Sequence, residues 1–259
     1  MPYFQENDVK LYYETDGEGT PIVLLHPPVM GHLTFRFQRP LAKHFKLIFV
    51  DLLDSGRSTK HSSAANVTEL ARLTHSLLKK LNVKKVIVLG YSNGGSIAQE
   101  FALRYPESTA GMILIGGFPE VSSFLLKKEF ELGIWAAGKE LISLFSFALS
   151  RAHFTSHKEQ QEMAGFIKKA DSETLKRIYE DGMNYVSTDR LSQIKVPVLL
   201  LYGRRDRYMR PYLLPFCRHL NDLEIVLISE VAHQVPTKRP DECNQIVKNW
   251  MMRKGLVTI

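Results

Sequence analysis

The stretch that decides the fold is Val86-Ile87-Val88-Leu89-Gly90-Tyr91-Ser92-Asn93-Gly94-Gly95. It opens with a short, continuous apolar run, which is typical of a buried strand in a parallel sheet. The residues that follow, from Ser92 to Arg104, predict a helix. Glycines between the two parts allow the backbone to turn sharply. The sequence therefore predicts a strand, a tight turn that carries Ser92, and a helix directly after it.

The turn fits the pattern Gly-x-Ser-x-Gly, in which the serine projects above the end of a sheet. Its oxygen would lie near the first turn of the helix, where free backbone N–H groups favour negative charge. We therefore predict that Ser92 is a nucleophile. The alternative is a glycine-rich turn in which Ser92 only caps the helix.

A nucleophilic serine needs a general base, and the base needs a group that orients it. Asp206 follows the apolar run Val198–Tyr202, and His233 follows the run Leu223–Ile228. Because both come just after strands, they are expected at the same edge of the sheet as Ser92. The order serine, acid, histidine along the chain also fits. We predict that His233 is the base and that Asp206 orients it.

Two other residues after strands are alternatives for these roles. Glu120 is the rival acid, and His26 is a second histidine at a strand end. We expect His26 to brace its loop rather than to act as a base.

Runs of apolar residues and helical patterns alternate from about residue 20 to 116 and again from about 196 to the end. This alternation predicts an α/β domain with a mostly parallel sheet that is covered on both faces. Residues 120–190 lack β-branched runs and have Leu, Phe, Lys and Glu at helical spacing, with breaks expected at glycines. We predict a core of residues 1–119 and 191–259 and a helical cap, or lid, of residues 120–190. The expected helices outside the cap include Thr68–Leu81, with Thr68 as its N-cap, and Asp241–Lys254.

The chain resembles the esterase-like α/β-hydrolases over nearly its whole length. Four stretches carry the resemblance: Val23-Leu24-Leu25-His26; Asp51-Leu52-Leu53-Asp54-Ser55-Gly56-Arg57-Ser58; the turn at Ser92; and Pro197 to Asp206 together with Ala232-His233. The resemblance implies a carboxylesterase-like enzyme that cleaves small, fairly apolar esters through an acyl-enzyme, with no cofactor. The same motifs occur in lactonases, carbon–carbon bond hydrolases and perhydrolases, and in some small-molecule receptors that retain the triad.

The loop after the first of these strands departs from the family pattern. The family usually has His-Gly followed by a residue whose backbone N–H helps to bind the oxyanion, whereas this chain has His26-Pro27-Pro28-Val29-Met30. Proline has no N–H to donate. We therefore predict that the N–H groups of Val29 and Asn93 form the oxyanion hole.

Substrate contacts are expected from this loop, the serine turn and the aromatic-rich cap. The predicted pocket residues are Pro28, Tyr91, Phe124, Trp135 and Phe145. No Arg or His of the cap stands out as a partner for a carboxylate, which favours a neutral ester.

Charge and composition limit the other functions. The 259 residues carry a formal net charge of +7, but the basic pairs are spread along the chain and mixed with acidic residues. We expect no nucleic-acid partner. We also expect no membrane span, no obligate protein partner and no metal motif, since Cys217 and Cys243 are the only cysteines. The polar N-terminus does not resemble a secretory signal, which predicts a cytoplasmic protein.

Overall fold

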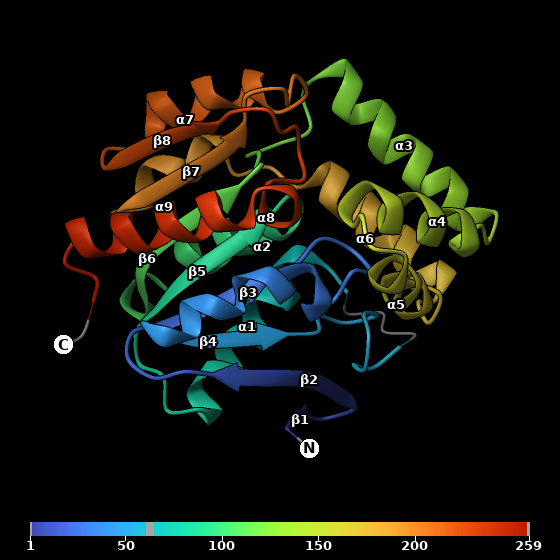
Figure 1. Cartoon of the computed structure of the whole chain (residues 1–259), viewed down its shortest axis with the longest axis horizontal. Coiled ribbons are helices and arrows are strands. Elements are labelled where there is room, and N and C mark those ends of the chain that lie inside the picture. Colours follow the sequence, from blue (N-terminus) through green and yellow to red (C-terminus); the bar gives the residue numbers. More distant parts are fainter. Residues whose placement is uncertain (1, 61–64, 258–259) are drawn as a thin grey trace.

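The protein folds around one eight-stranded sheet, as the computed structural model shows for residues 2–60 and 65–257 (Figure 1). The strands are β1 (Tyr3–Glu6), β2 (Val9–Asp16), β3 (Pro21–Leu25), β4 (Lys46–Val50), β5 (Val86–Tyr91), β6 (Thr109–Ile115), β7 (Val198–Gly203) and β8 (Leu223–Ile228). Their order across the sheet is β1-β2-β4-β3-β5-β6-β7-β8. The pairs β1–β2 and β2–β4 are antiparallel, and all others are parallel. The predicted mostly parallel α/β architecture is confirmed.

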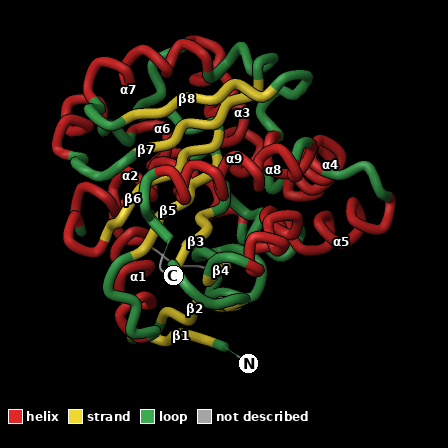
Figure 2. Tube along the Cα trace, turned by 60° about the vertical axis from the view of Figure 1, so that its left-hand side comes forward, coloured by secondary structure: helices red, strands yellow, loops and turns green. Residues whose placement is uncertain are grey.

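Helices cover both faces of this sheet, which runs through the middle of the molecule in Figure 2. The helices are α1 (Val67–Lys80), α2 (Gly94–Arg104), α3 (Phe124–Gly138), α4 (Ile142–His153), α5 (His157–Ile167), α6 (Ser172–Asn184), α7 (Leu213–His219), α8 (Val235–Lys238) and α9 (Pro240–Arg253). Short 3-10 helices are η1 (His32–Lys43), η2 (Pro106–Ser108), η3 (Thr188–Gln193) and η4 (Arg210–Tyr212). Alternate residues of each strand point to opposite faces, so the central strands contribute to two cores. In β5, Val86 and Val88 pack towards α1 and α2, whereas Ile87 and Leu89 pack towards η1 and α9.

The helices begin at positions that differ slightly from those predicted. Asn66, not Thr68, caps α1, because its side chain accepts a hydrogen bond of 2.8 Å from the N–H of Glu69. Helix α2 begins at Gly94 rather than at Ser92, since Ser92 has a left-handed φ of 53° that no helix can contain.

Helices α3 to α6 lie between β6 and β7 in the sequence, and we call them the helical insert (residues 124–184). They gather beside the carboxyl ends of the central strands, at the right of Figure 1. Of the four glycines expected to break this region, Gly138 is the last residue of α3, whereas Gly133, Gly165 and Gly182 lie inside helices. Two of them instead permit close packing, because a Cβ on Gly133 would meet Tyr179 at 2.8 Å and one on Gly182 would meet Asn93 at 2.7 Å. That the insert acts as a lid remains a prediction. No helix within residues 2–60 and 65–257 has the length and apolar character needed to cross a membrane.

Candidate active site

Ser92 stands on a sharp turn between β5 and α2. Its φ of 53° is strained for a residue with a side chain, and its N–H is held by the carbonyl of Ile115 at 2.9 Å. Glycine is required on both sides of the turn. A Cβ on Gly90 would lie 2.5 Å from the carbonyl oxygen of Gly94, and one on Gly94 would lie 2.2 Å from that of Leu25. The turn therefore projects Ser92 from the end of the sheet.

His233 and Asp206 meet at the same edge of the sheet. The Nδ1 atom of His233 lies 2.8 Å from Oδ2 of Asp206, which is buried. A hydrogen bond to a carboxylate makes Nδ1 the protonated nitrogen and leaves Nε2 as the acceptor. Gly116 at the end of β6 makes room for the imidazole, because a Cβ there would lie 2.7 Å from its Cε1. Glu120, the alternative acid, has no such contact with His233 among the described residues.

Ser92 and His233 line one cavity of about 110 Å³. Its walls come from the serine turn, the loop after β3, and helices α3, α4 and α6 of the insert. The apolar part of the wall includes Met30, Phe118, Leu126, Phe130 and Leu149. Tyr91 also lines it, and its ring lies 5.3 Å from that of His233. Burial raises the pKa of Tyr91 well above its usual value, so the phenol is neutral. The cavity can therefore hold a small molecule against Ser92.

The loop after β3 forms a tight turn next to Ser92. The N–H of Met30 donates to the carbonyl of Pro27 at 3.4 Å, which places Pro28 and Val29 at the centre of the turn. Val29 has a φ of 61°, an uncommon conformation for a β-branched residue. Neither the N–H of Val29 nor that of Asn93 donates a hydrogen bond to another described residue. Both of the predicted donor groups are therefore free to bind a ligand.

A buried histidine fixes this turn from behind. His26 donates from Nδ1 to the carbonyl of Pro27 at 2.7 Å and accepts at Nε2 from the N–H of Leu52 at 2.9 Å. Burial lowers the pKa of His26 to about 4, although the hydrogen bond to Pro27 acts in the opposite direction. The ring is neutral and both of its nitrogens make hydrogen bonds to the backbone, so His26 supports this turn as a brace.

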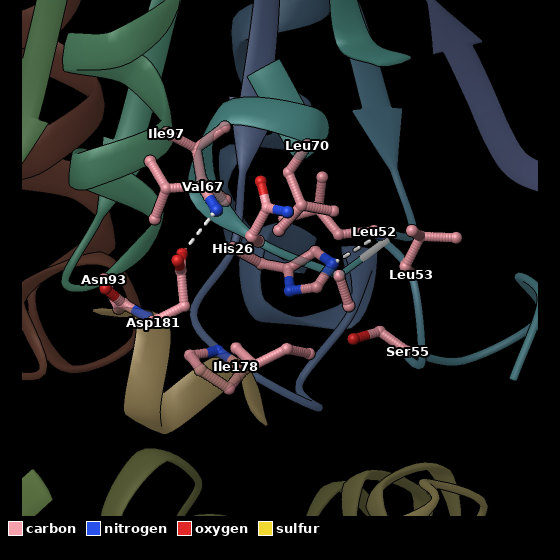
Figure 3. A pocket seen from close by; sticks show the side chains of 13 residues that line it. His26, Leu52, Leu53, Ser55, Val67, Leu70, Asn93, Ile97, Ile178 and Asp181 are labelled. Atoms are coloured by element: carbon pink, nitrogen blue, oxygen red, sulfur yellow. Dashed lines mark hydrogen bonds between the residues drawn. The ribbon is translucent and has the colours of Figure 1, made fainter. Parts of the chain in front are cut away.

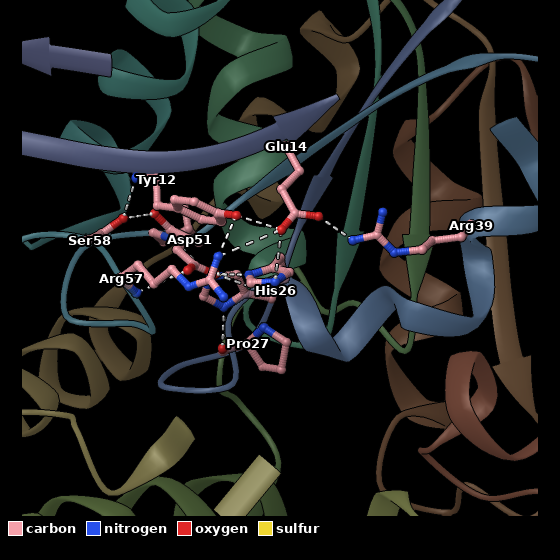
Figure 4. A network of polar contacts seen from close by, with 10 residues as sticks. Tyr12, Glu14, His26, Pro27, Arg39, Asp51, Arg57 and Ser58 are labelled. Atoms are coloured by element: carbon pink, nitrogen blue, oxygen red, sulfur yellow. Dashed lines mark hydrogen bonds and ion pairs between the residues drawn. The ribbon is translucent and has the colours of Figure 1, made fainter. Parts of the chain in front are cut away.

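A polar network extends from this brace to the edge of the sheet (Figure 4). Asp51, fully buried, accepts from the N–H of His32 at 2.8 Å, from its Nδ1 at 2.7 Å and from the N–H of Arg57 at 3.0 Å. Burial opposes the charge of Asp51, but these contacts with His32 outweigh it and lower its pKa. Glu14 continues the network through Tyr12 and Arg39. The network holds the loops after β3 and β4 in a fixed arrangement beside the cavity.

A second cavity lies behind the serine turn (Figure 3). It measures about 20 Å³, which is room for one water molecule. Pro28 and Asn93 line both cavities and so form the wall between them. Asp181, which also lines this cavity, accepts from the N–H of Val67 at 2.7 Å. This space is too small for a substrate and belongs to the packing of the insert against the core.

Comparisons with known proteins identify the family of this chain. The sequence model of the alpha/beta hydrolase fold matches residues 20–235. The chain belongs to the α/β-hydrolase family. The predicted family resemblance is thereby confirmed.

Individual members of the family that are similar to this α/β-hydrolase differ in their named reactions. It is 28% identical to the "Putative carbamate hydrolase RutD" of Azorhizobium caulinodans, over 95% of this chain and 97% of the relative. It is 26% identical to a 2-hydroxy-6-oxononadienedioate/2-hydroxy-6-oxononatrienedioate hydrolase of Klebsiella pneumoniae subsp. pneumoniae, over 92% and 88%. In fold it is similar to a thermophilic esterase from Thermogutta terrifontis, with a TM-score of 0.83, 23% identity and coverage of 95% and 94%.

The predicted pocket residues of this α/β-hydrolase divide into two groups. Pro28 and Tyr91 line the cavity. Phe124 and Trp135 do not, because they lie on the outer side of α3 and are 72% and 53% exposed. Phe145 stacks on Tyr179 at a ring distance of 5.8 Å and supports the wall from behind. The structure therefore brings the first two, but not the last three, to the cavity.

The sequence analysis missed two polar residues of the insert that line the cavity, Glu129 of α3 and His153 of α4. Glu129 is one of several charged residues in its segment, and His153 is the last residue of its helix. Nothing in their sequence context distinguishes them, since their position depends on how α3 and α4 are rotated against the core.

Proposed function

We propose that this protein is a serine hydrolase that cleaves small carboxylic esters through an acyl-enzyme on Ser92. The observation that carries the proposal is the placement of three groups at one edge of the sheet. Ser92 faces the cavity, His233 lines the same cavity, and Asp206 holds His233 through a 2.8 Å hydrogen bond. The family membership and the likeness to an esterase in fold support the reaction class.

In the proposed reaction, Ser92 attacks the ester carbonyl while Nε2 of His233 takes its proton. Asp206 fixes the imidazole tautomer and stabilises the imidazolium that forms. The tetrahedral intermediate collapses, and the alcohol leaves with the proton from His233. Water then repeats the cycle on the acyl-enzyme and releases the acid.

The oxyanion of the intermediate is bound by the N–H groups of Val29 and Asn93. Their freedom from other hydrogen bonds and the position of Asn93 just before α2 support this assignment. A Val29→Pro variant is unsuitable as a test, because proline cannot adopt a φ of 61°. Replacing Val29 by its α-hydroxy acid analogue exchanges the peptide N–H for an ester oxygen and keeps the side chain. We expect a loss of about 100- to 1000-fold in kcat; unchanged turnover would exclude this donor.

The first experiment is hydrolysis of p-nitrophenyl esters from acetate to decanoate by the parent protein and by Ser92→Ala. We expect hydrolysis that disappears in the folded variant, with a preference for short chains because the cavity is small. The matched control is Ser96→Ala, one turn later in α2, whose buried hydroxyl has no hydrogen-bond partner among the described residues. Activity that survives in Ser92→Ala would reject the nucleophile.

A carbamate is the second candidate substrate class. One relative that covers nearly the whole chain is named as a carbamate hydrolase, and attack on a carbamate carbonyl needs the same nucleophile, base and donors. Adding phenyl carbamate to the ester series tests it: faster release of phenol from the carbamate than from phenyl acetate would favour this class.

A further inference from the structure

The charges around the cavity restrict the substrate. Among the described residues that line it, the ionisable side chains are Glu129, His153, Tyr91, Tyr179 and His233, and none is Lys or Arg. A site that selects a carboxylate normally presents a basic side chain to it. This cavity instead presents a carboxylate of its own. Its side chains therefore disfavour a carboxylate group on the substrate.

His153 adds a fixed hydrogen-bond acceptor to the wall. Its Nδ1 lies 3.0 Å from the hydroxyl oxygen of Thr237, whose hydrogen is donated to the carbonyl of Gln234 at 3.3 Å. Both contacts are satisfied together when the hydroxyl donates to Gln234 and accepts from His153, an arrangement that puts the proton on Nδ1 and leaves Nε2 as an acceptor. Burial, with smaller contributions from the charges of His233 and Lys238, lowers the pKa of His153 to about 3. The ring is neutral, and its Nε2 has no partner among the described residues.

Glu129 supplies the second acceptor, from the neighbouring helix α3. Its side chain is accessible to solvent, yet its surroundings are apolar enough for burial to raise the pKa of the carboxyl. The charged groups that act on it are His233 and Asp206, both at the reaction centre. By contrast, Glu131 on the same helix lies 2.6 Å from Lys128. Glu129 thus places a carboxyl group in the wall of the cavity that Ser92 and His233 also line, and no Lys or Arg is among the described residues of that wall.

We propose that Glu129 and His153 select substrates that present N–H donors to the cavity, such as a carbamoyl –NH₂ or an ammonium group, and disfavour a carboxylate there. The proposal rests on the function proposed above and names the substrate class of that site. An N–H donor beside the reactive carbonyl would bond to Nε2 of His153 or to the carboxylate of Glu129. A carboxylate would meet two acceptors and, among the described residues of the wall, no Lys or Arg.

The test uses substituted phenylboronic acids, which form tetrahedral adducts with a nucleophilic serine and leave the ring substituent in the cavity. Inhibition constants are measured against p-nitrophenyl butyrate hydrolysis for carbamoyl, aminomethyl, carboxy and methyl substituents, each at the 3- and 4-positions. We expect the carbamoyl or the aminomethyl compound to bind at least about tenfold more tightly than the carboxy compound. Comparison of these two separates a neutral donor from a cation.

Variants then assign the selectivity to residues. Glu129→Gln is expected to narrow the ratio between the aminomethyl and carboxy compounds by about tenfold. The control Glu131→Gln makes the same change of charge on the same helix and should leave the ratio unchanged. His153→Phe removes the neutral acceptor and should lower the preference for carbamoyl over methyl.

Three outcomes would overturn the proposal. The first is equal binding of the four substituents in the parent protein. The second is that Glu129→Gln weakens the binding of all four compounds equally and shifts the pH profile of ester hydrolysis, since Glu129 would then act through His233. The third is that Glu129→Gln and Glu131→Gln change the ratio between the aminomethyl and carboxy compounds by the same factor. Failure of the parent protein to cleave any ester would instead refute the proposed function, and calorimetry with benzamide and benzoate would still measure the selectivity.

Discussion

Acidification is expected to destabilise this protein because the fold buries two neutral histidines. The pKa of His26 is about 4 and that of His153 is about 3 in the folded state, mainly because of burial. Both values lie below the unfolded value of about 6.5. The unfolded chain therefore binds more protons between these limits. Stability falls as the pH drops below about 6.5 and continues to fall down to the folded pKa values.

The magnitude follows from these pKa values. At pH ~5 an unfolded imidazole is almost fully protonated, whereas buried His26 remains mostly neutral, so the free energy of unfolding decreases by about 2 kcal/mol relative to pH ~7.5. His153 contributes about the same amount, which gives about 4 kcal/mol for the pair. Protonation of His26 would place an N–H at Nε2, where the fold needs an acceptor for the N–H of Leu52. Protonation of His153 would place a charge in a buried position near His233 and Lys238.

Urea unfolding at pH ~7.5 and pH ~5, followed by tryptophan fluorescence, measures this difference. The variant His153→Gln should lose about half of the pH dependence, or about 2 kcal/mol, whatever its stability at neutral pH. The control is His157→Gln, which removes an exposed imidazole from α5. If His153→Gln and the parent protein lose the same free energy on acidification, the burial of a neutral His153 is refuted.

Three further predictions concern the helices. Gly182→Ala is expected to lower kcat/KM for p-nitrophenyl butyrate by about tenfold, because its Cβ would displace the side chain of Asn93, which lies 2.7 Å away; unchanged kinetics would show that Asn93 can move without effect. A Cβ on Gly165 would meet no atom within 4 Å, so Gly165→Ala should raise the thermal midpoint through a gain of up to about 1 kcal/mol in helix propensity. A lower midpoint would contradict the open space around Gly165. Asn66→Ala should reduce the free energy of unfolding by about 1 kcal/mol through loss of the α1 cap. Denaturant titration measures this loss, with Thr68→Ala as the control. An equal loss of stability in the two variants would contradict Asn66 as the cap.

The sheet and the positions of Ser92, Asp206 and His233 could be predicted because they depend on local patterns. Ser92 and Asp206 follow apolar runs that form the buried strands β5 and β7, and His233 follows the partly buried edge strand β8. Parallel strands end at one edge, so the three side chains share that edge whatever the details of the helices. The 2.8 Å contact between Asp206 and His233 is the structural consequence.

The contribution of the helical insert could not be predicted in the same way. A helix rich in Leu and Phe has several apolar faces, and the sequence does not tell which one packs on the core. Phe124 and Trp135 therefore lie on the outside of α3, whereas Glu129 on the same helix reaches the cavity. Gly182 was misinterpreted for a related reason: its missing side chain serves contact with Asn93, not a break in the helix.

The turn at Pro27-Pro28-Val29-Met30 has a conformation that the chain would not adopt alone. A positive φ at the second central position of a β-turn normally requires glycine, and Val29 holds it at 61°. Such strain persists only where the surroundings over-determine the backbone. Here His26 and Met30 both donate to the carbonyl of Pro27 from one side. On the other side Val29 packs in an apolar cluster with Phe154 and other residues of the insert. Pro27 and Pro28 have no backbone N–H, so neither can compete with the N–H of Val29 as a donor. The packing of the insert keeps the N–H of Val29 free beside Ser92. In this protein the insert therefore supports the geometry of the candidate active site as well as forming part of the wall of its cavity.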